Sequence, residues 1–288
     1  MPNLKSIKRK IASVKNTRQI TKAMKMVAGA KLKKAQLAMN EFKPYASTYE
    51  KIIQNIANNT ILHNNPLFGV REHVKNIGYL IISSDRGLCG SFNINIFKEA
   101  LDSIKSKKLD NQNIKLYIAG KKGTDFLKRY NYNIKHNASA TVKNAENDFI
   151  SELSYIVSKD FINGEIDELY FISNRYVSTL TQKTDNIKIL PIEKNKEPIN
   201  SGGYIIEPDS NEEEVLTNIF NDFIYTEINI RLLESNAGEQ ASRMNAMDNA
   251  TRNAGKMINK LTLTYNKARQ TAVTLEILDL VNGANALK

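Results

Sequence analysis

The final stretch of this chain carries an apolar repeat that strongly limits the folds open to it. Residues 209–288 contain no proline, so one helix can run through them without interruption. Apolar side chains recur there at alternating spacings of three and four residues, the heptad pattern of a left-handed coiled coil. At ~1.5 Å per residue this helix would be on the order of 100 Å long. The repeat runs through Leu216, Ile219, Phe223, Thr226, Ile230, Leu233, Ala237, Gln240, Met244, Met247, Thr251, Ala254, Ile258, Leu261, Tyr265, Ala268, Ala272 and Leu275.

The beginning of the chain supplies a matching partner, because residues 3–43 also lack proline. In strict register its repeat passes through three polar residues, Arg18, Thr21 and Lys25, while the apolar stripe moves sideways. We interpret this as an imperfect coiled coil with a local phase slip. The displaced stripe is Ile20, Met24 and Val27, and the strict register is Leu4, Ile7, Ile11, Val14, Ala28, Leu32, Ala35, Met39 and Phe42.

Helical spacing continues past Pro44, so the sequence predicts an N-terminal helix over residues 1–60 and a C-terminal helix over 210–288. The long connection between them allows an antiparallel pair. The C-terminal helix is the longer one, and its end, residues 272–288, is apolar on nearly every side. Such a helix is normally buried. We therefore expect this end to insert into a cavity of another protein.

Positive charge is concentrated in the N-terminal helix. The whole chain has 41 Lys and Arg against 30 Asp and Glu, and residues 1–40 hold basic side chains with no acidic one. Such an element calls for an acidic partner, which could be protein, nucleic acid or a membrane surface. The basic residues are Lys5, Lys8, Arg9, Lys10, Lys15, Arg18, Lys22, Lys25, Lys31, Lys33 and Lys34.

The middle of the chain, residues 74–192, alternates strand-like and helix-like segments, which predicts a small, mainly parallel sheet with helices on its faces. Residues 193–209 read as a linker. The predicted strands are 77–83, 115–119, 168–175 and 187–190, and the predicted helices 94–109, 124–130 and 145–161. The fold class is therefore α/β: an antiparallel coiled coil of the two terminal helices plus a small Rossmann-like domain.

Few residues of the sequence suggest a catalytic or ligand-binding site. The segment Gly120-Lys121-Lys122-Gly123-Thr124 follows a strand and opens a helix, but its spacing departs from that of a phosphate-binding loop, which favours an ordinary turn. The single cysteine, Cys89, has no histidine near it in sequence, which favours a structural role. The three histidines lack metal-ligand spacing. We expect no catalytic residue, cofactor or metal.

Four motifs in the right order resemble the gamma subunit of F-type ATP synthases along nearly the whole chain. They are residues 20–28 (ITKAMKMVA), residues 84–90 (SDRGLCG), the pair 242–244 (SRM) with 249–251 (NAT), and residues 265–270 (YNKARQ) with 274–279 (TLEILD) before Gly283. The resemblance implies a non-catalytic rotor shaft. It turns inside a hexamer of alpha and beta subunits and couples ion flow through a membrane ring to ATP synthesis or hydrolysis.

The resemblance also implies residue roles and a location. Contact with the beta subunits would fall to Lys22, Met24, Lys25, Arg243, Arg269, Gln270, Thr274 and Glu276. A foot on the membrane ring and the epsilon subunit would include Tyr204 and Glu207. The protein would lie at the cytoplasmic face of a bacterial inner membrane, touching the membrane only indirectly.

Two other functions compete with this one. A basic coiled coil could bind nucleic acid, although aromatic side chains are lacking in its basic stretch. The middle domain could be an enzyme that uses a nucleotide. The apolar end of the C-terminal helix favours a protein partner over both.

Overall fold

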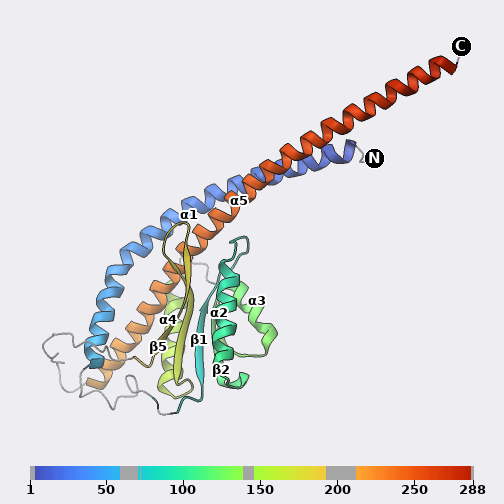
Figure 1. Ribbon diagram of the computed structural model, residues 1–288. Coiled ribbons are helices and arrows are strands. Elements are labelled where there is room, and N and C mark those ends of the chain that lie inside the picture. Colours follow the sequence, from blue (N-terminus) through green and yellow to red (C-terminus); the bar gives the residue numbers. More distant parts are fainter. Residues whose placement is uncertain (1–3, 59–70, 72, 139–145, 193–211, 287–288) are drawn as a thin grey trace. The chain divides into compact units, whose positions relative to one another are not determined.

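The computed structural model describes the chain outside residues 1–3, 59–70, 72, 139–145, 193–211 and 287–288. Two compact units are present, one made of residues 1–29 with 243–288 and one of residues 30–242. Two long helices contribute to both units. They are α1 (Leu4–Asn58) and α5 (Glu212–Ala286), at the two ends of the chain (Figure 1).

Both terminal helices are as long as the sequence predicted, with 55 residues in α1 and 75 in α5. Pro44 lies inside α1 and does not end it. The Thr48 hydroxyl donates a hydrogen bond to the Pro44 carbonyl oxygen at 3.0 Å. The prediction of two long terminal helices packed together is confirmed. None of the described helices is long and apolar enough to cross a membrane.

The unit of residues 30–242 is built on a five-stranded sheet with the strand order β3-β2-β1-β4-β5. Its central strand β1 pairs in parallel with both β2 and β4, and β5 runs antiparallel to β4 at one edge. The predicted, mainly parallel sheet is therefore present. The strands are β1 (Ile77–Ile82), β2 (Ile114–Ala119), β3 (Asn133–Ala138), β4 (Glu168–Tyr176) and β5 (Gln182–Leu190).

Side chains of β1 alternate between two cores on opposite faces of the sheet. Tyr79 and Ile81 join a core with α2 (Phe92–Ser106) and α3 (Lys121–Leu127). Leu80 and Ile82 join a second core with α4 (Glu146–Ile162), the end of α1 and the first part of α5. Burial on both faces explains why this strand is apolar at every position, as is usual for a parallel sheet. The second core fixes residues 216–232 of α5 against the sheet.

Two elements differ from the sequence prediction. The strand β3 was not expected, and β5 begins at Gln182 rather than at position 187. Both are edge strands whose side chains are largely polar, so they are held by backbone pairing on one side. Two one-turn 3-10 helices, η2 (Asn111–Asn113) and η3 (Lys128–Tyr130), complete the described elements. The segment predicted as a linker lies outside the described residues.

Candidate functional site

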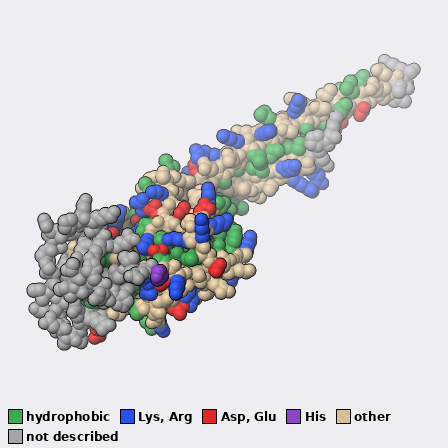
Figure 2. All heavy atoms as spheres, turned by 60° about the horizontal axis from the view of Figure 1, so that its bottom comes forward, with side chains coloured by type: hydrophobic (Ala, Val, Ile, Leu, Met, Phe, Trp, Pro, Cys, Tyr) green, Lys and Arg blue, Asp and Glu red, His purple; other side chains and the backbone are tan. Residues whose placement is uncertain are grey.

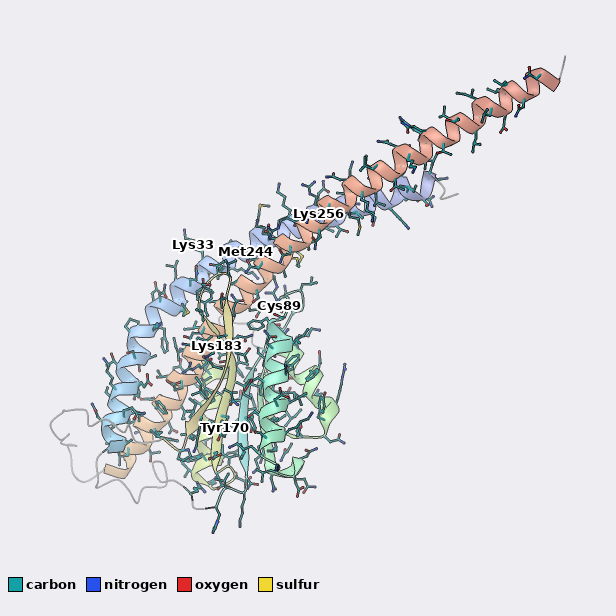
Figure 3. All side chains as sticks on the ribbon, viewed as in Figure 1. Lys33, Cys89, Tyr170, Lys183, Met244 and Lys256 are labelled. Carbon is teal, nitrogen blue, oxygen red and sulfur yellow. The ribbon has the colours of Figure 1, made fainter. Side chains whose placement is uncertain are left out.

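The first candidate site is the two-helix segment formed by residues 4–29 of α1 and 243–286 of α5. Three cross-helix contacts show that the helices run antiparallel, because the partner on α5 moves down the sequence as the position on α1 moves up. Lys25 pairs with Asp248, Thr21 with Thr251, and Arg18 lies over Gly255. Figure 3 labels Met244 and Lys256, which bracket these positions in the sequence of α5. The antiparallel coiled coil is therefore the observed arrangement.

The interface between the helices contains a polar layer, which comprises Thr21 and Lys25 of α1 with Asp248 and Thr251 of α5. The Lys25 ammonium donates a hydrogen bond to the Asp248 carboxylate at 2.6 Å. The hydroxyl of Thr251 donates to that of Thr21 at 2.8 Å. The Lys25 hydrogen bond holds the pKa of the Asp248 carboxyl below its ordinary value. The layer is thus matched across the two helices in both charge and hydrogen bonding.

This layer corrects the predicted phase slip. Thr21 is buried and Lys25 half-buried, whereas Ile20 is 60% exposed and Val27 57% exposed. The strict heptad register therefore holds through the polar positions. Of the displaced apolar stripe, Ile20 and Val27 face outward and Met24 is half-buried. A pattern count weighs only the apolar character of one helix, so it cannot detect a polar side chain whose partner lies on the other helix.

The end of α5 extends past the described start of α1. The cross-helix contacts set a register in which Leu4 lies level with about position 269 of α5. Beyond that level the apolar side chains of α5 are exposed, and Leu280 is 73% exposed. Figure 2 shows Lys and Arg side chains along this two-helix segment and green apolar ones toward its far end. The exposed apolar side chains are Val273, Leu275, Ile277, Leu278, Leu280 and Val281. We call residues 271–286 the tip.

The turn between β2 and α3 was the one candidate for phosphate binding. Its backbone N–H groups are taken up within the chain, because Lys121 donates to the Asp85 carboxylate, Lys122 to the Ser84 carbonyl and Gly123 to the Ser83 hydroxyl. Gly120 has φ of +111°, and a β-carbon there would lie 2.2 Å from the Ser83 carbonyl oxygen. The two loops are therefore joined directly, and these amides are not available to cradle a phosphate.

Cys89 lies in the first of these loops, beside the amino end of α2 (Figure 3). Its thiol is buried and accepts a hydrogen bond from the Asn93 side-chain amide at 3.5 Å. The same amide donates to the Ser84 hydroxyl at 2.7 Å. The cysteine thus belongs to a structural network. Among the described residues, no group of three or more His, Cys, Asp or Glu side chains could hold a metal ion.

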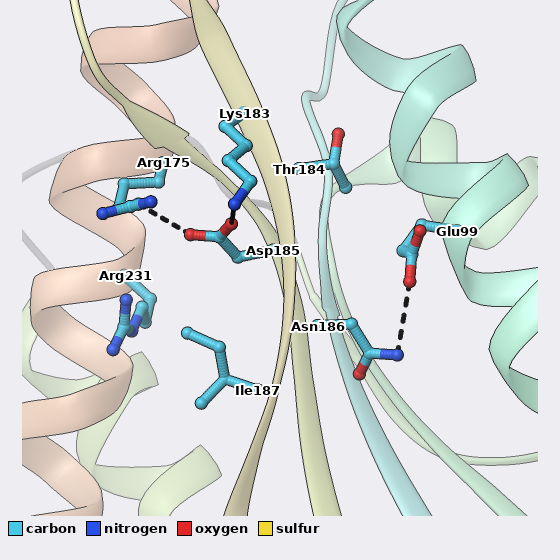
Figure 4. A pocket seen from close by; sticks show the side chains of 8 residues that line it. All are labelled: Glu99, Arg175, Lys183, Thr184, Asp185, Asn186, Ile187 and Arg231. Atoms are coloured by element: carbon cyan, nitrogen blue, oxygen red, sulfur yellow. Dashed lines mark hydrogen bonds and ion pairs between the residues drawn. The ribbon is translucent and has the colours of Figure 1, made fainter.

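An open hollow of about 630 Å³ lies beside β5 in the second unit. On one side of the strand, Asp185 pairs with Arg175 at 2.6 Å and with Lys183 at 3.7 Å (Figure 4). On the other side, the Asn186 amide donates to the Glu99 carboxylate at 3.3 Å. Asp185 thus has two cationic partners, and the Glu99 carboxylate accepts from a neutral amide, so the hollow mixes both signs of charge and presents no concentrated site for a charged ligand. Its lining is Glu99, Arg175, Lys183, Thr184, Asp185, Asn186, Ile187 and Arg231.

Behind this hollow, α5 buries a charged triad. Arg231 donates to the Glu227 carboxylate at 3.3 Å and pairs with Glu234 at 3.6 Å. Burial raises the pKa of both carboxyls, and the attraction of Arg231 only partly offsets this effect. All three residues lie on α5, so these ion pairs are internal to the helix.

Comparison with known proteins agrees with this geometry. A family model described as ATP synthase matches residues 3–287. The ATP synthase gamma chain of Nitratidesulfovibrio vulgaris is 39% identical over 292 residues, and that of Coxiella burnetii is 37% identical over 290 residues, each alignment covering 100% of both chains. The chain belongs to the ATP synthase gamma chain family.

Solved structures agree with this family assignment. A chain from the central stalk and c-ring structure of the Tetrahymena thermophila mitochondrial ATP synthase superposes with a TM-score of 0.64 at 25% identity, covering 80% of this chain and 99% of that one. A chain from the Euglena gracilis mitochondrial ATP synthase gives a TM-score of 0.67 at 17% identity, covering 99% and 94%. The second likeness supports the fold alone.

The residues that the family resemblance singled out occupy two parts of the two-helix segment. At the polar layer, Lys22 is exposed and Met24 and Arg243 are half-buried. Lys25 already has a partner within the chain, so its charge is shared with Asp248. The other four, Arg269, Gln270, Thr274 and Glu276, are all exposed at the base of the tip. The two groups are thus separated along the two-helix segment.

Two predicted residues, Tyr204 and Glu207, lie outside the described residues. Sequence reasoning also missed Asp248 as a cross-helix partner. The available signal was that Asp248 is the one acidic residue in the basic stretch 243–269 of α5. An isolated acidic residue one position from a heptad core site, opposite a core lysine, would have indicated the pair.

Proposed function

We propose that this chain is the central rotor shaft of an F-type ATP synthase, the element that connects a membrane ion ring to the catalytic subunits. The observation that supports this most directly is the tip, an exposed apolar helix end that continues past its partner helix. An apolar helix end of this kind requires a protein surface around it. In our proposal the surrounding protein is a hexamer of alpha and beta subunits, and family membership supports this choice.

In this role the chain has a mechanical rather than a chemical task. The second unit, with residues 216–232 of α5 packed on the sheet, gives the shaft a broad base for contact with the ring and the epsilon subunit. The coiled coil carries rotation from this base toward the tip. Arg269 and Gln270, exposed where the tip begins, are positioned to contact a beta subunit, and Thr274 and Glu276 lie on the next turn.

The proposal includes no active site in this chain. ATP chemistry would take place on the beta subunits, and the chain would be held at the cytoplasmic face of the membrane through its partners. The basic surface of residues 5–34 would face acidic segments of those subunits. Electrostatic attraction of this kind mainly speeds and orients assembly, so assembly should weaken as salt concentration rises.

The experiment that tests this proposal replaces apolar tip residues by serine. Leu275→Ser with Leu278→Ser changes side chains that are already exposed in the isolated chain. The variant should therefore fold and unfold like the parent, because exposed substitutions usually change stability by less than about 0.5 kcal/mol. Assembly with purified alpha and beta subunits, followed by size-exclusion chromatography, should nevertheless fail or weaken strongly.

A matched control is Leu180→Ser, the same chemical change at an exposed leucine in the turn between β4 and β5. This control should assemble normally. The proposal would be overturned if the parent chain formed no complex with alpha and beta subunits. It would lose its main support if the tip variant assembled as well as the control.

A further inference from the structure

The segment of α1 around the polar layer offers two faces that compete for the same partner helix. The observed face presents Thr21 and Lys25 to α5, while the neighbouring face presents Ile20 and Val27 to solvent. The two faces are offset by one residue, which is a rotation of about 100° around the helix axis. On apolar burial alone the second face is the better one, because Ile20 and Val27 are both more than half exposed.

Specific cross-helix contacts stabilise the polar face instead. Rotation of α1 would remove Lys25 from Asp248, now 2.6 Å away, and Thr21 from Thr251, now 2.8 Å away. Polar side chains at core positions of coiled coils fix register, and they do so at some cost in stability. Small residues flank the layer: Gly255 lies under the Arg18 guanidinium, and a β-carbon at Gly29 would lie 3.5 Å from the Met244 sulfur.

We propose that the polar layer is a rotational lock, which holds α1 in one setting against α5 and keeps Ile20 and Val27 on the outer surface. The lock is a property of the chain itself. Its consequence for torque rests on the proposed function, since a shaft whose helices could turn past each other would lose part of the applied rotation. Lys25 and Asp248 thereby become positioning residues, acting through the setting of the helix rather than by contact with a reacting group.

The test traps the two settings of the full-length chain as disulfides. One reporter carries Thr21→Cys with Thr251→Cys, whose side-chain oxygens are in contact in the observed setting. The other carries Ile20→Cys with Thr251→Cys, which can close only after α1 rotates. Both also carry Cys89→Ser. Without further substitutions, the disulfide of the second reporter should form no more than about a tenth as often as that of the first, because minor conformations are usually populated at 0.1–10%.

The lock is then weakened with Lys25→Met and Asp248→Leu together (the apolar variant), which removes the ion pair of the layer without leaving a buried charge. The Ile20 reporter should now close nearly as often as the Thr21 reporter. The exchanged pair, Lys25→Asp with Asp248→Lys, keeps the attraction across the helices, although it loses the 3.0 Å pair of Asp248 with Arg252 within α5, and should restore most of the parent ratio. Lys15→Met, at an exposed position outside the layer, is the matched control and should leave the ratio unchanged.

Two results would overturn the lock. An unchanged closure ratio in the apolar variant would mean that other contacts set the rotation. Loss of both disulfides in that variant would mean that the pair holds the helices together rather than in register. The same variants in the assembled complex distinguish the lock from the proposed function. With the lock weakened, ion-driven synthesis should fall further than in the exchanged pair, which also lacks Lys25, whereas failure to form any complex contradicts the proposed function and leaves the disulfide result standing.

Discussion

Replacement of Phe220 by alanine should loosen α5 from the sheet. Phe220 is fully buried, and its ring lies 6.1 Å from that of Phe161 on α4, between centroids, inside the core that joins both helices to the sheet. Deletion of a buried phenylalanine costs about 3–5 kcal/mol, because apolar contacts are lost and a cavity remains. The lost aromatic pair is part of that cost.

The measurement is urea unfolding followed by tyrosine fluorescence, since the chain has 12 tyrosines and no tryptophan. With a denaturant slope of about 3 kcal/mol per M, the loss corresponds to a midpoint lower by about 1–1.7 M. Tyr155→Ala, on α4 but 61% exposed, is the control and should shift the free energy of unfolding by less than about 0.5 kcal/mol. Equal shifts for the two variants would refute the view that this core anchors α5.

Two further predictions concern the second unit. Gly120→Ala should destabilise the chain by about 3 kcal/mol or more, because the positive φ of this residue and its contact with the Ser83 carbonyl oxygen exclude a β-carbon. Gly87→Ala is the control and should be nearly neutral, because there is open space around Gly87. Thermal unfolding of the two variants measures the difference. Burial raises the pKa of Glu227 and Glu234 above the ordinary value of 4.5, so their contribution to stability is complete below about pH 4.5 and declines as pH rises through the folded pKa. Glu227→Gln should flatten this decline in urea titrations from about pH 4 to pH 8, and an equally steep decline would contradict the assignment.

The architecture was largely predictable because its strongest signals are apolar repeats. The heptad positions of α5 are buried or half-buried from Leu216 to Ala272, which lies a few residues past the level of Leu4, the described start of α1. The central strand β1, apolar on both faces, was equally clear. By contrast, β3 and the first half of β5 are polar edge segments, and backbone pairing to one neighbour leaves little trace in side-chain pattern.

The candidate site was predictable only where the sequence of a single helix contains the signal. The tip follows from the apolar residues at the end of α5 together with the shorter length of α1. The polar layer depends on which residue of one helix meets which residue of the other, information that no pattern within a single helix contains. Thr21 and Lys25 read alone as interruptions, and only Asp248 and Thr251 across the interface make them favourable.

The tip consists of one helix rather than two, and this has a mechanical consequence. Where α1 and α5 are paired, bending the shaft must shear one helix against the other, and cross-helix contacts resist that shear. Past the level of Leu4, toward its C-terminal end, α5 has no partner helix in the described residues and bends as a single helix. Flexural stiffness therefore drops abruptly near residue 269, and the last turns form a compliant joint at the end of a stiffer rod. Under the proposed function, a joint at that place would let the tip stay in contact with the surrounding subunits while the paired part of the shaft changes its direction.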